Sequence, residues 1–216
     1  MVTRRQLLKS SAVAATGFLA PTIVPASVFG ADAPSNRITI GFVGVGRMGM
    51  GDLRELLGFK QVQIVAVCDI DANRTTNAQK TVEAHYAKRS AGSTYKGCSI
   101  YGDYRDLVAR DNIDAVCVVT PDHWHALPSI AAAKAGKDIF LQKPLTLTIQ
   151  EGRILSDTVR RYNRIFQVGS QQRSDSRFRQ ACELERNGRI GKLHTVKVGF
   201  GTDPGTSPVP KPTLTV

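Results

Sequence analysis

The chain has 216 residues, of which 42% are hydrophobic and 22% are charged. This composition is typical of a soluble globular protein, and the length allows one complete domain of about 100 to 150 residues plus part of a second. No apolar run reaches the roughly 18 residues that a membrane-spanning helix needs. We therefore expect no transmembrane span in the mature chain.

The formal net charge is +11, a value that would fit a nucleic-acid-binding protein. Much of the excess comes from arginines after residue 150, where acidic residues are interspersed. No zinc-finger, RNP or basic-zipper pattern accompanies them. A solvated surface or a domain interface therefore explains these arginines better, and no nucleic-acid partner is expected.

Four cysteines, at positions 68, 98, 117 and 182, are too few and too scattered for a disulfide framework. Cys68 and Cys117 end apolar runs, where a free thiol behaves as a small hydrophobic side chain. The sequence contains no CxxC pattern. We expect neither a zinc site nor redox chemistry at these cysteines.

The first 31 residues are expected to form a targeting segment. Arg4 and Arg5 stand together before a modestly apolar, alanine-rich stretch over 12–20, and a tail rich in Pro, Ala and Ser follows. This order resembles a twin-arginine export signal and is set aside from the fold. The alternative is a frayed, slightly basic terminus. We expect an exported, periplasmic or otherwise extracytoplasmic protein, with cleavage between Ala26 and Ala31 or a retained anchor.

A nucleotide-binding pattern begins at residue 38. The β-rich run 38–43 is consistent with a buried parallel strand. It leads directly into the GxGxxG sequence of residues 44–49, after which leucines recur at helical spacing. The strand before and the helix after make this arrangement typical of a dinucleotide fingerprint rather than of an ordinary glycine turn.

Each residue of this fingerprint has an expected role. Gly44 makes the tight turn, Gly46 lets a diphosphate approach the backbone, and Gly49 lets helix and strand pack closely. The helix is expected to begin near Arg47. Its first N–H groups, at Arg47 and Met48, would then bind the anion.

An acid stands at the distance expected for a dinucleotide site. The apolar run 62–68 ends at Asp69, 20 residues beyond Gly49. An acid there hydrogen-bonds the adenosine ribose hydroxyls of NAD, and it would repel the extra phosphate of NADP. The expected cofactor is NAD, with NADP as the lesser alternative because Arg74 follows closely. A helix-capping role is the alternative for Asp69.

Strand-like and helix-like segments alternate after Asp69. Helix-compatible stretches cover 71–89, 103–109 and the run up to Ala135, and strand-like runs cover 114–119, 138–141 and 165–168. This alternation predicts an α/β fold, a Rossmann doubly wound parallel sheet over residues 36–168. Ligands bind beyond the carboxyl ends of such strands, so residues 44–49, Asp69, 120–125 and 142–144 should converge on one crevice.

These motifs together resemble the Gfo/Idh/MocA family, the glucose-fructose oxidoreductase and inositol dehydrogenase group. They are GxGxxG with Asp69, the Thr-Pro-x-x-x-His of Thr120, Pro121 and His125, Ala-Gly-Lys at 135–137, and a Glu-Lys-Pro-like triplet at 142–144. The likeness runs from Arg37 to about Gly201. One departure is Gln142, which replaces the family's Glu; it can still hydrogen-bond the cofactor ribose but supplies no charge.

The resemblance implies catalytic and cofactor-binding roles. Lys143 would be the active-site lysine beside the nicotinamide and the substrate hydroxyl, where a cationic amine can stabilise alkoxide character as hydride leaves. Thr120, Pro121, His125 and Gln142 would complete the cofactor site, with His125 on the nicotinamide side. The alternatives are a solvated lysine and a hydrogen-bonded histidine at a helix start. No metal is expected, because no third ligand accompanies the histidines.

Residues 169–216 resemble only the start of the family's second α/β domain, a substrate domain that roughly doubles the chain. A helix around 178–186 and a strand around 193–200 fit this start, and the proline-rich residues after 202 are expected to form a loop. We therefore expect a truncated C-terminal domain. By the resemblance, the full domain would carry an Asp/His pair for acid–base work and a sheet that mediates homo-oligomer formation.

The expected function is that of an NAD(P)-dependent oxidoreductase that transfers hydride between a sugar or polyol hydroxyl and a tightly bound nicotinamide cofactor. The first alternative is an NAD-dependent glycosidase that oxidises its sugar transiently. The second is a non-catalytic nucleotide-binding fragment. The sequence by itself does not choose among the three.

Overall fold

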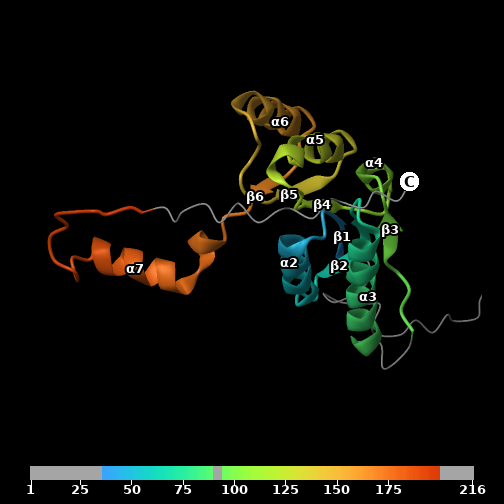
Figure 1. Ribbon diagram of the computed structural model, residues 1–216, viewed down its shortest axis with the longest axis horizontal. Coiled ribbons are helices and arrows are strands. Elements are labelled where there is room, and N and C mark those ends of the chain that lie inside the picture. Colours follow the sequence, from blue (N-terminus) through green and yellow to red (C-terminus); the bar gives the residue numbers. More distant parts are fainter. Residues whose placement is uncertain (1–35, 90–93, 200–216) are drawn as a thin grey trace, which may run out of the picture. The chain divides into compact units, whose positions relative to one another are not determined.

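The computed structural model describes residues 36–89 and 94–199 (Figure 1). The predicted export segment, residues 1–31, and the predicted loop after residue 202 lie outside the described residues. The chain divides into two units, residues 1–169 and residues 170–216, and each is described by itself.

Six parallel strands form one sheet in the first unit. In sheet order they are β3 (Ser99–Tyr101), β2 (Val62–Cys68), β1 (Ile38–Val43), β4 (Ala115–Val118), β5 (Asp138–Leu141) and β6 (Phe166–Val168). The order 3-2-1-4-5-6 is that of the Rossmann fold, with its topological switch between β1 and β4. The predicted fold class is confirmed.

The central strands end at a common level. Val43 of β1 pairs with Cys68 of β2 and with Val118 of β4, and Val118 pairs in turn with Leu141 of β5. The four segments that follow these strands therefore begin side by side at one edge of the sheet. This register brings the predicted site segments together, although they are far apart in the sequence.

Helices cover both faces of the sheet (Figure 1). One face carries α2 (Arg47–Leu57) and α3 (Ala72–Arg89), and the other carries α4 (Tyr104–Val108), α5 (Ala126–Lys134) and α6 (Ile149–Arg161). Leu53 and Val82 anchor the first layer, and Leu107 and Leu155 anchor the second. Because both faces are covered, the central strands are nearly continuous apolar runs, as parallel sheets require.

Two elements of this unit were absent from the sequence prediction. The strand β3 has only three residues and follows a polar stretch. The helix α6 begins with a capping box: the Thr148 hydroxyl accepts from the Glu151 N–H at 3.2 Å, and the Glu151 carboxylate accepts from the Thr148 N–H at 2.9 Å. The Thr-x-x-Glu pattern is a helix-start signal that could have located α6.

The second unit contains one regular helix, α7 (Ser176–Arg186), among its described residues. This helix confirms the predicted one around 178–186, and Asp175 caps it by accepting from the Arg177 N–H at 2.8 Å. The strand predicted around 193–200 is wrong for residues 193–199, which have no regular secondary structure. Alternating apolar residues form a strand only when a neighbouring strand satisfies their backbone. No described helix of either unit is long and apolar enough to cross a membrane.

The cysteines differ sharply in their surroundings. Cys68, Cys98 and Cys117 are buried, whereas Cys182 on α7 is exposed. Burial raises the pKa of the Cys68 thiol to about 12, with a smaller contribution from the Asp69 carboxylate. Burial likewise raises the pKa of Cys98 to about 12. Since the thiolate is the nucleophile, these thiols should be inert in the folded chain.

We predict that a thiol-specific disulfide reagent at about pH 8 modifies one cysteine per native chain, Cys182. Denaturant should expose the other three to the reagent. A Cys182→Ser variant should lose the rapid reaction and keep the reaction seen after unfolding. Rapid modification of the native Cys182→Ser chain would contradict this burial pattern.

Candidate functional site

The turn after β1 is built from backbone in close contact. Gly44 has a φ of +89°, and a Cβ at this position would come within 2.6 Å of the Val119 carbonyl oxygen. A Cβ on Gly49 would overlap the Gly44 carbonyl oxygen. Only glycine suits either position, the first for its dihedral angle and the second for space. The start of α2 is thereby packed directly against the turn.

Gly46 stands at the N-cap of α2 and has no side chain to cap the helix. The nearest heavy atom to a Cβ built there is Nη1 of Arg74 at 3.5 Å, so protein packing leaves the position open. The N–H groups of a first helical turn have no intrahelical acceptors. They and the helix dipole favour an anion at this point.

Asp69 lies opposite this helix start. Its Oδ2 accepts from the Val45 N–H at 2.9 Å, and its Oδ1 accepts from the Asp71 N–H at 3.1 Å. Each carboxylate oxygen can accept a further hydrogen bond, so ribose hydroxyls can still bind. Asp69 thus stabilises the glycine-rich turn and also offers acceptors at its edge.

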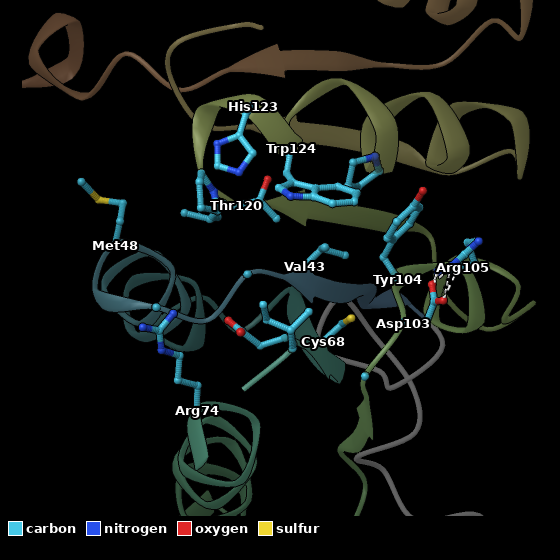
Figure 2. A pocket seen from close by; sticks show the side chains of 18 of the residues that line it. Val43, Met48, Cys68, Arg74, Asp103, Tyr104, Arg105, Thr120, His123 and Trp124 are labelled. Atoms are coloured by element: carbon cyan, nitrogen blue, oxygen red, sulfur yellow. Dashed lines mark hydrogen bonds and ion pairs between the residues drawn. The ribbon is translucent and has the colours of Figure 1, made fainter. Parts of the chain in front are cut away.

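A cavity of about 530 Å³ lies between these groups, within the range of 300 to 1,000 Å³ common for ligand sites. Seven of the predicted cofactor residues line it: Gly44, Gly46, Arg47, Met48, Asp69, Thr120 and Pro121. Figure 2 shows Met48 at the start of α2 on one side, with Thr120, His123 and Trp124 from the segment before α5 on another. The convergence expected from the strand ends is present for these residues.

Thr120 provides a separate indication that the cavity suits a polar ligand. Its Oγ1 is buried and has no hydrogen-bond partner among the described residues. A buried hydroxyl without a partner is uncommon, because desolvation is then uncompensated. Since Thr120 lines the cavity, a ligand with hydroxyl or phosphate oxygens would satisfy it. The glycine cradle, the carboxylate and this hydroxyl together fit a dinucleotide.

Several lining residues were not identified as site residues from the sequence. Tyr104 and Trp124 add aromatic surface, and Trp124 is 45% exposed. Arg74 lines the same cavity and forms a 3.4 Å ion pair with Asp71. Tyr104 could be placed only after β3 was located, whereas Trp124 lies inside the Thr-Pro-x-x-x-His motif and could have been noticed there.

Asp103 closes the cavity on the side of α4. Its Oδ1 accepts from the Arg105 N–H at 2.9 Å and caps the helix, and its Oδ2 receives the Arg105 guanidinium at 2.6 Å. These hydrogen bonds from Arg105 lower the pKa of the Asp103 carboxyl. The local pair adds no net charge to this side of the cavity.

His125 lies behind the cavity and does not line it. The side chain is 1% exposed, Nε2 is 2.8 Å from the Thr120 carbonyl oxygen, and Nδ1 is 2.5 Å from that of Pro144. The ring therefore joins the segment after β4 to the segment after β5. Both ring nitrogens lie against backbone carbonyl oxygens, which only accept, and both contacts are hydrogen bonds only when the ring carries both N–H groups. This is the geometry of the hydrogen-bonded alternative for this histidine.

Gln142 and Lys143 stand at the end of β5, outside the cavity. Gln142 is buried, and its Oε1 accepts from the Lys143 N–H at 3.0 Å. The Lys143 side chain is exposed, and the peptide bond to Pro144 is cis. The described residues contain no group of three His, Cys, Asp or Glu side chains that could hold a metal ion.

Comparison with known proteins relates this geometry to a family. The model of the oxidoreductase family with an NAD-binding Rossmann fold, Gfo/Idh/MocA, matches residues 38–170. The chain belongs to this family. The resemblance inferred from the motifs is thereby confirmed, and with it NAD as the cofactor that the fold accommodates.

Individual relatives come from two kinds of enzyme. The chain is 31% identical over 177 residues to a glycosyl hydrolase family 109 protein of Shewanella sp. strain W3-18-1, covering 74% of this chain and 37% of that protein. Among solved structures it resembles the myo-inositol 2-dehydrogenase of Lactobacillus plantarum at 31% identity and a TM-score of 0.59, covering 73% of this chain and 43% of that one.

A second similar structure contains bound ligands. The scyllo-inositol dehydrogenase of Lactobacillus casei, with bound NAD(H) and scyllo-inositol, is 27% identical with a TM-score of 0.60, over 72% of this chain and 42% of that one. The chain therefore spans about two fifths of the length of these relatives. What the family fold supplies here is the nucleotide-binding part.

The second and third glycines of the fingerprint make a matched pair for mutation. We predict that Gly46→Ala leaves the free energy of unfolding nearly unchanged, because its Cβ meets no backbone, but weakens NAD binding at least about tenfold by blocking the diphosphate. Gly49→Ala should lower the unfolding free energy by about 2 kcal/mol or more, because its Cβ overlaps Gly44. Denaturant titration and calorimetry measure both. Equal stability losses in the two variants would contradict these roles.

Proposed function

We propose that this chain carries the cofactor-binding part of an NAD-dependent oxidoreductase that acts on a hydroxyl group of a sugar or polyol. The observation that carries the proposal is the cavity in which the glycine cradle, the Asp69 carboxylate and the unpartnered Thr120 hydroxyl meet. The family supports oxidoreductase chemistry. The two inositol dehydrogenase structures support a polyhydroxylated substrate.

The two halves of the sheet suggest where each part of the cofactor lies. In this fold the strands β1 to β3 form one mononucleotide-binding half and β4 to β6 form the other. Asp69 follows β2, so the adenosine ribose belongs to its side. The nicotinamide then belongs to the ends of β4 and β5, beside Thr120 and Lys143.

Lys143 is the residue proposed to act on the substrate. Bound NAD would supply the acceptor for hydride from the carbinol carbon. The exposed amine of Lys143 would hydrogen-bond the reacting hydroxyl and take up its proton as the hydride leaves, so that a carbonyl forms; in the reverse direction it would return that proton. His125 and Gln142 would support this group through the backbone on either side of it.

NAD is favoured over NADP by the Asp69 carboxylate, which would repel a phosphate on the adenosine ribose. Arg74 works in the opposite direction, since its guanidinium lines the same cavity. Its ion pair with Asp71 partly offsets that attraction. The balance supports NAD as the preferred cofactor.

We predict that Lys143→Ala lowers turnover about 10²-fold or more, because the reacting hydroxyl then has no group beside it to take up its proton. Affinity for NAD should change little, since Lys143 does not line the cavity. Reduced nicotinamide is followed by absorbance with a panel of inositols and hexoses, and NAD binding by calorimetry. Lys134→Ala, an exposed lysine at the end of α5, is the control. Unchanged turnover in Lys143→Ala would remove the proposed role.

A glycosidase is the second candidate, favoured by the similarity to glycosyl hydrolase family 109 proteins. Such an enzyme would oxidise its sugar transiently and regain the hydride at the end of the cycle. Release of the aglycone from an aryl glycoside without net formation of reduced nicotinamide would support it. NAD binding with no turnover on either panel would instead support a non-catalytic nucleotide-binding protein.

Export by the twin-arginine route is a further part of the proposal and rests on residues 1–31. This route carries folded proteins, so a cofactor loaded in the cytoplasm would travel bound and be recycled by a second substrate. We predict that replacing Arg4 and Arg5 together by Lys retains the chain in the cytoplasm of a bacterium with this pathway, because the signal requires the arginine pair. Fractionation and immunoblotting measure this, with Lys9→Arg as control. Normal export of the double variant would contradict it.

A further inference from the structure

Asp52 joins two parts of the first unit that are far apart in the sequence. It lies on α2, three residues after Gly49, and its Oδ2 accepts from the Gln142 side-chain amide at 2.9 Å. The helix α2 begins at the proposed diphosphate site, whereas Gln142 follows β5. This side-chain hydrogen bond therefore links α2, which follows β1, to the loop after β5 that carries Lys143.

Gln142 is fixed by its neighbours on several sides. Its side chain is 3% exposed; Nε2 donates to Asp52, and Oε1 accepts from the Lys143 N–H. A Cβ on Gly169 would come within 2.9 Å of that same Oε1, so the absence of a side chain there makes room for the amide. The carboxylate and the N–H together determine which way the amide faces. The backbone of Lys143 is held as a consequence.

The charge of Asp52 also acts on a thiol within the sheet. Burial raises the pKa of the Cys117 thiol on β4, and the Asp52 carboxylate raises it further. Among the described residues, no lysine or arginine forms an ion pair with Asp52. Among the described residues, this half-buried carboxylate thus has no cationic partner and lies close enough to β4 to act on Cys117, and β4 borders the switch between β1 and β4.

We propose that Asp52 is a positioning residue for the nicotinamide half of the site and places a negative charge beside the Gln142 amide. It acts through the Gln142 amide on the Lys143 backbone, and through its charge on the cofactor. Oxidised nicotinamide is cationic and reduced nicotinamide is neutral, so the carboxylate favours the oxidised form. This proposal rests on the proposed function for the location of the nicotinamide.

The pairing also explains why position 142 carries an amide. A Glu at this position would bring two carboxylates within hydrogen-bonding distance, and one of them would have to bind a proton. With Gln142 the pair is complete without a proton: one donor, one acceptor and one charge. The acid and the amide are complementary. Exchanging the two residues should therefore preserve both the hydrogen bond between them and the single negative charge.

The first experiment measures the dissociation constants of NAD⁺, NADH and ADP-ribose by calorimetry with the full chain. Asp52→Asn keeps a hydrogen-bond acceptor and removes the charge. We expect it to weaken NAD⁺ relative to NADH by about three- to tenfold. ADP-ribose, which has no nicotinamide, should bind as before. Glu55→Gln removes an equal charge from an exposed position on the same helix and is the matched control.

The second experiment exchanges the two groups. Gln142→Glu should lower the midpoint of denaturant unfolding, because it forces the two carboxylates together. The double variant Asp52→Asn/Gln142→Glu restores one acid and one amide in contact. It should recover both the unfolding midpoint and the preference for NAD⁺, a result that neither single variant can give.

The outcomes separate this proposal from the proposed function. If the unmodified chain binds no NAD⁺, NADH or ADP-ribose, the proposed function fails. If it binds them but Asp52→Asn leaves the NAD⁺ to NADH ratio unchanged, or shifts it no more than Glu55→Gln does, the role of Asp52 is overturned. Equal weakening of all three ligands would assign Asp52 to the diphosphate site and overturn it as well. Failure of the exchange variant to recover either property would contradict the acid–amide complementarity.

Discussion

The site depends on the close approach of α2 to the turn after β1. A side chain on Gly49 would overlap the Gly44 carbonyl oxygen, so this helix can begin where it does only because residue 49 has no Cβ. The position of the first turn then determines where the free N–H groups lie. It also determines where Asp52 lies, three residues further on, against Gln142. One steric condition thus sets both the proposed anion site and the link to the loop that carries Lys143.

Polar side chains around the site divide into those that face the cavity and those that fix the backbone behind it. Asp69 does both, since it accepts from the Val45 N–H and still lines the cavity. His125 and Gln142 are buried and bonded to backbone groups. A buried polar group left without a partner costs more free energy than a made hydrogen bond contributes, so these side chains specify one arrangement of the loops.

The parts of this structure that the sequence predicts are those with local signals. The strand before Gly44, the helix after it and Asp69 are recognised from their fixed spacing along the chain. Each glycine is required by a steric constraint within this short segment. The short β3 has no periodicity to detect, and α6 was missed although its capping box at Thr148 is visible in the sequence.

Contacts between distant residues are the part that sequence reasoning could not reach. Nothing near Asp52 indicates that it faces Gln142, 90 positions later, because that contact arises from the register of β1, β4 and β5. The lining role of Tyr104 likewise follows from where β3 ends. The predicted strand around 193–200 failed for the converse reason, since an alternating pattern specifies a strand only where a partner strand is present.

In the proposed function, binding and chemistry belong to different strands at the same edge of the sheet. The cavity is lined from the ends of β1, β2, β3 and β4, whereas Lys143 follows β5 and stands outside it. Affinity for a dinucleotide can therefore arise largely from its adenosine diphosphate part, with the reactive end held by fewer groups. In that case, how accurately the nicotinamide end is placed against Lys143 depends on how firmly the Lys143 backbone is held. The hydrogen bonds from His125 to Pro144 and from Lys143 to Gln142 are the contacts that hold it.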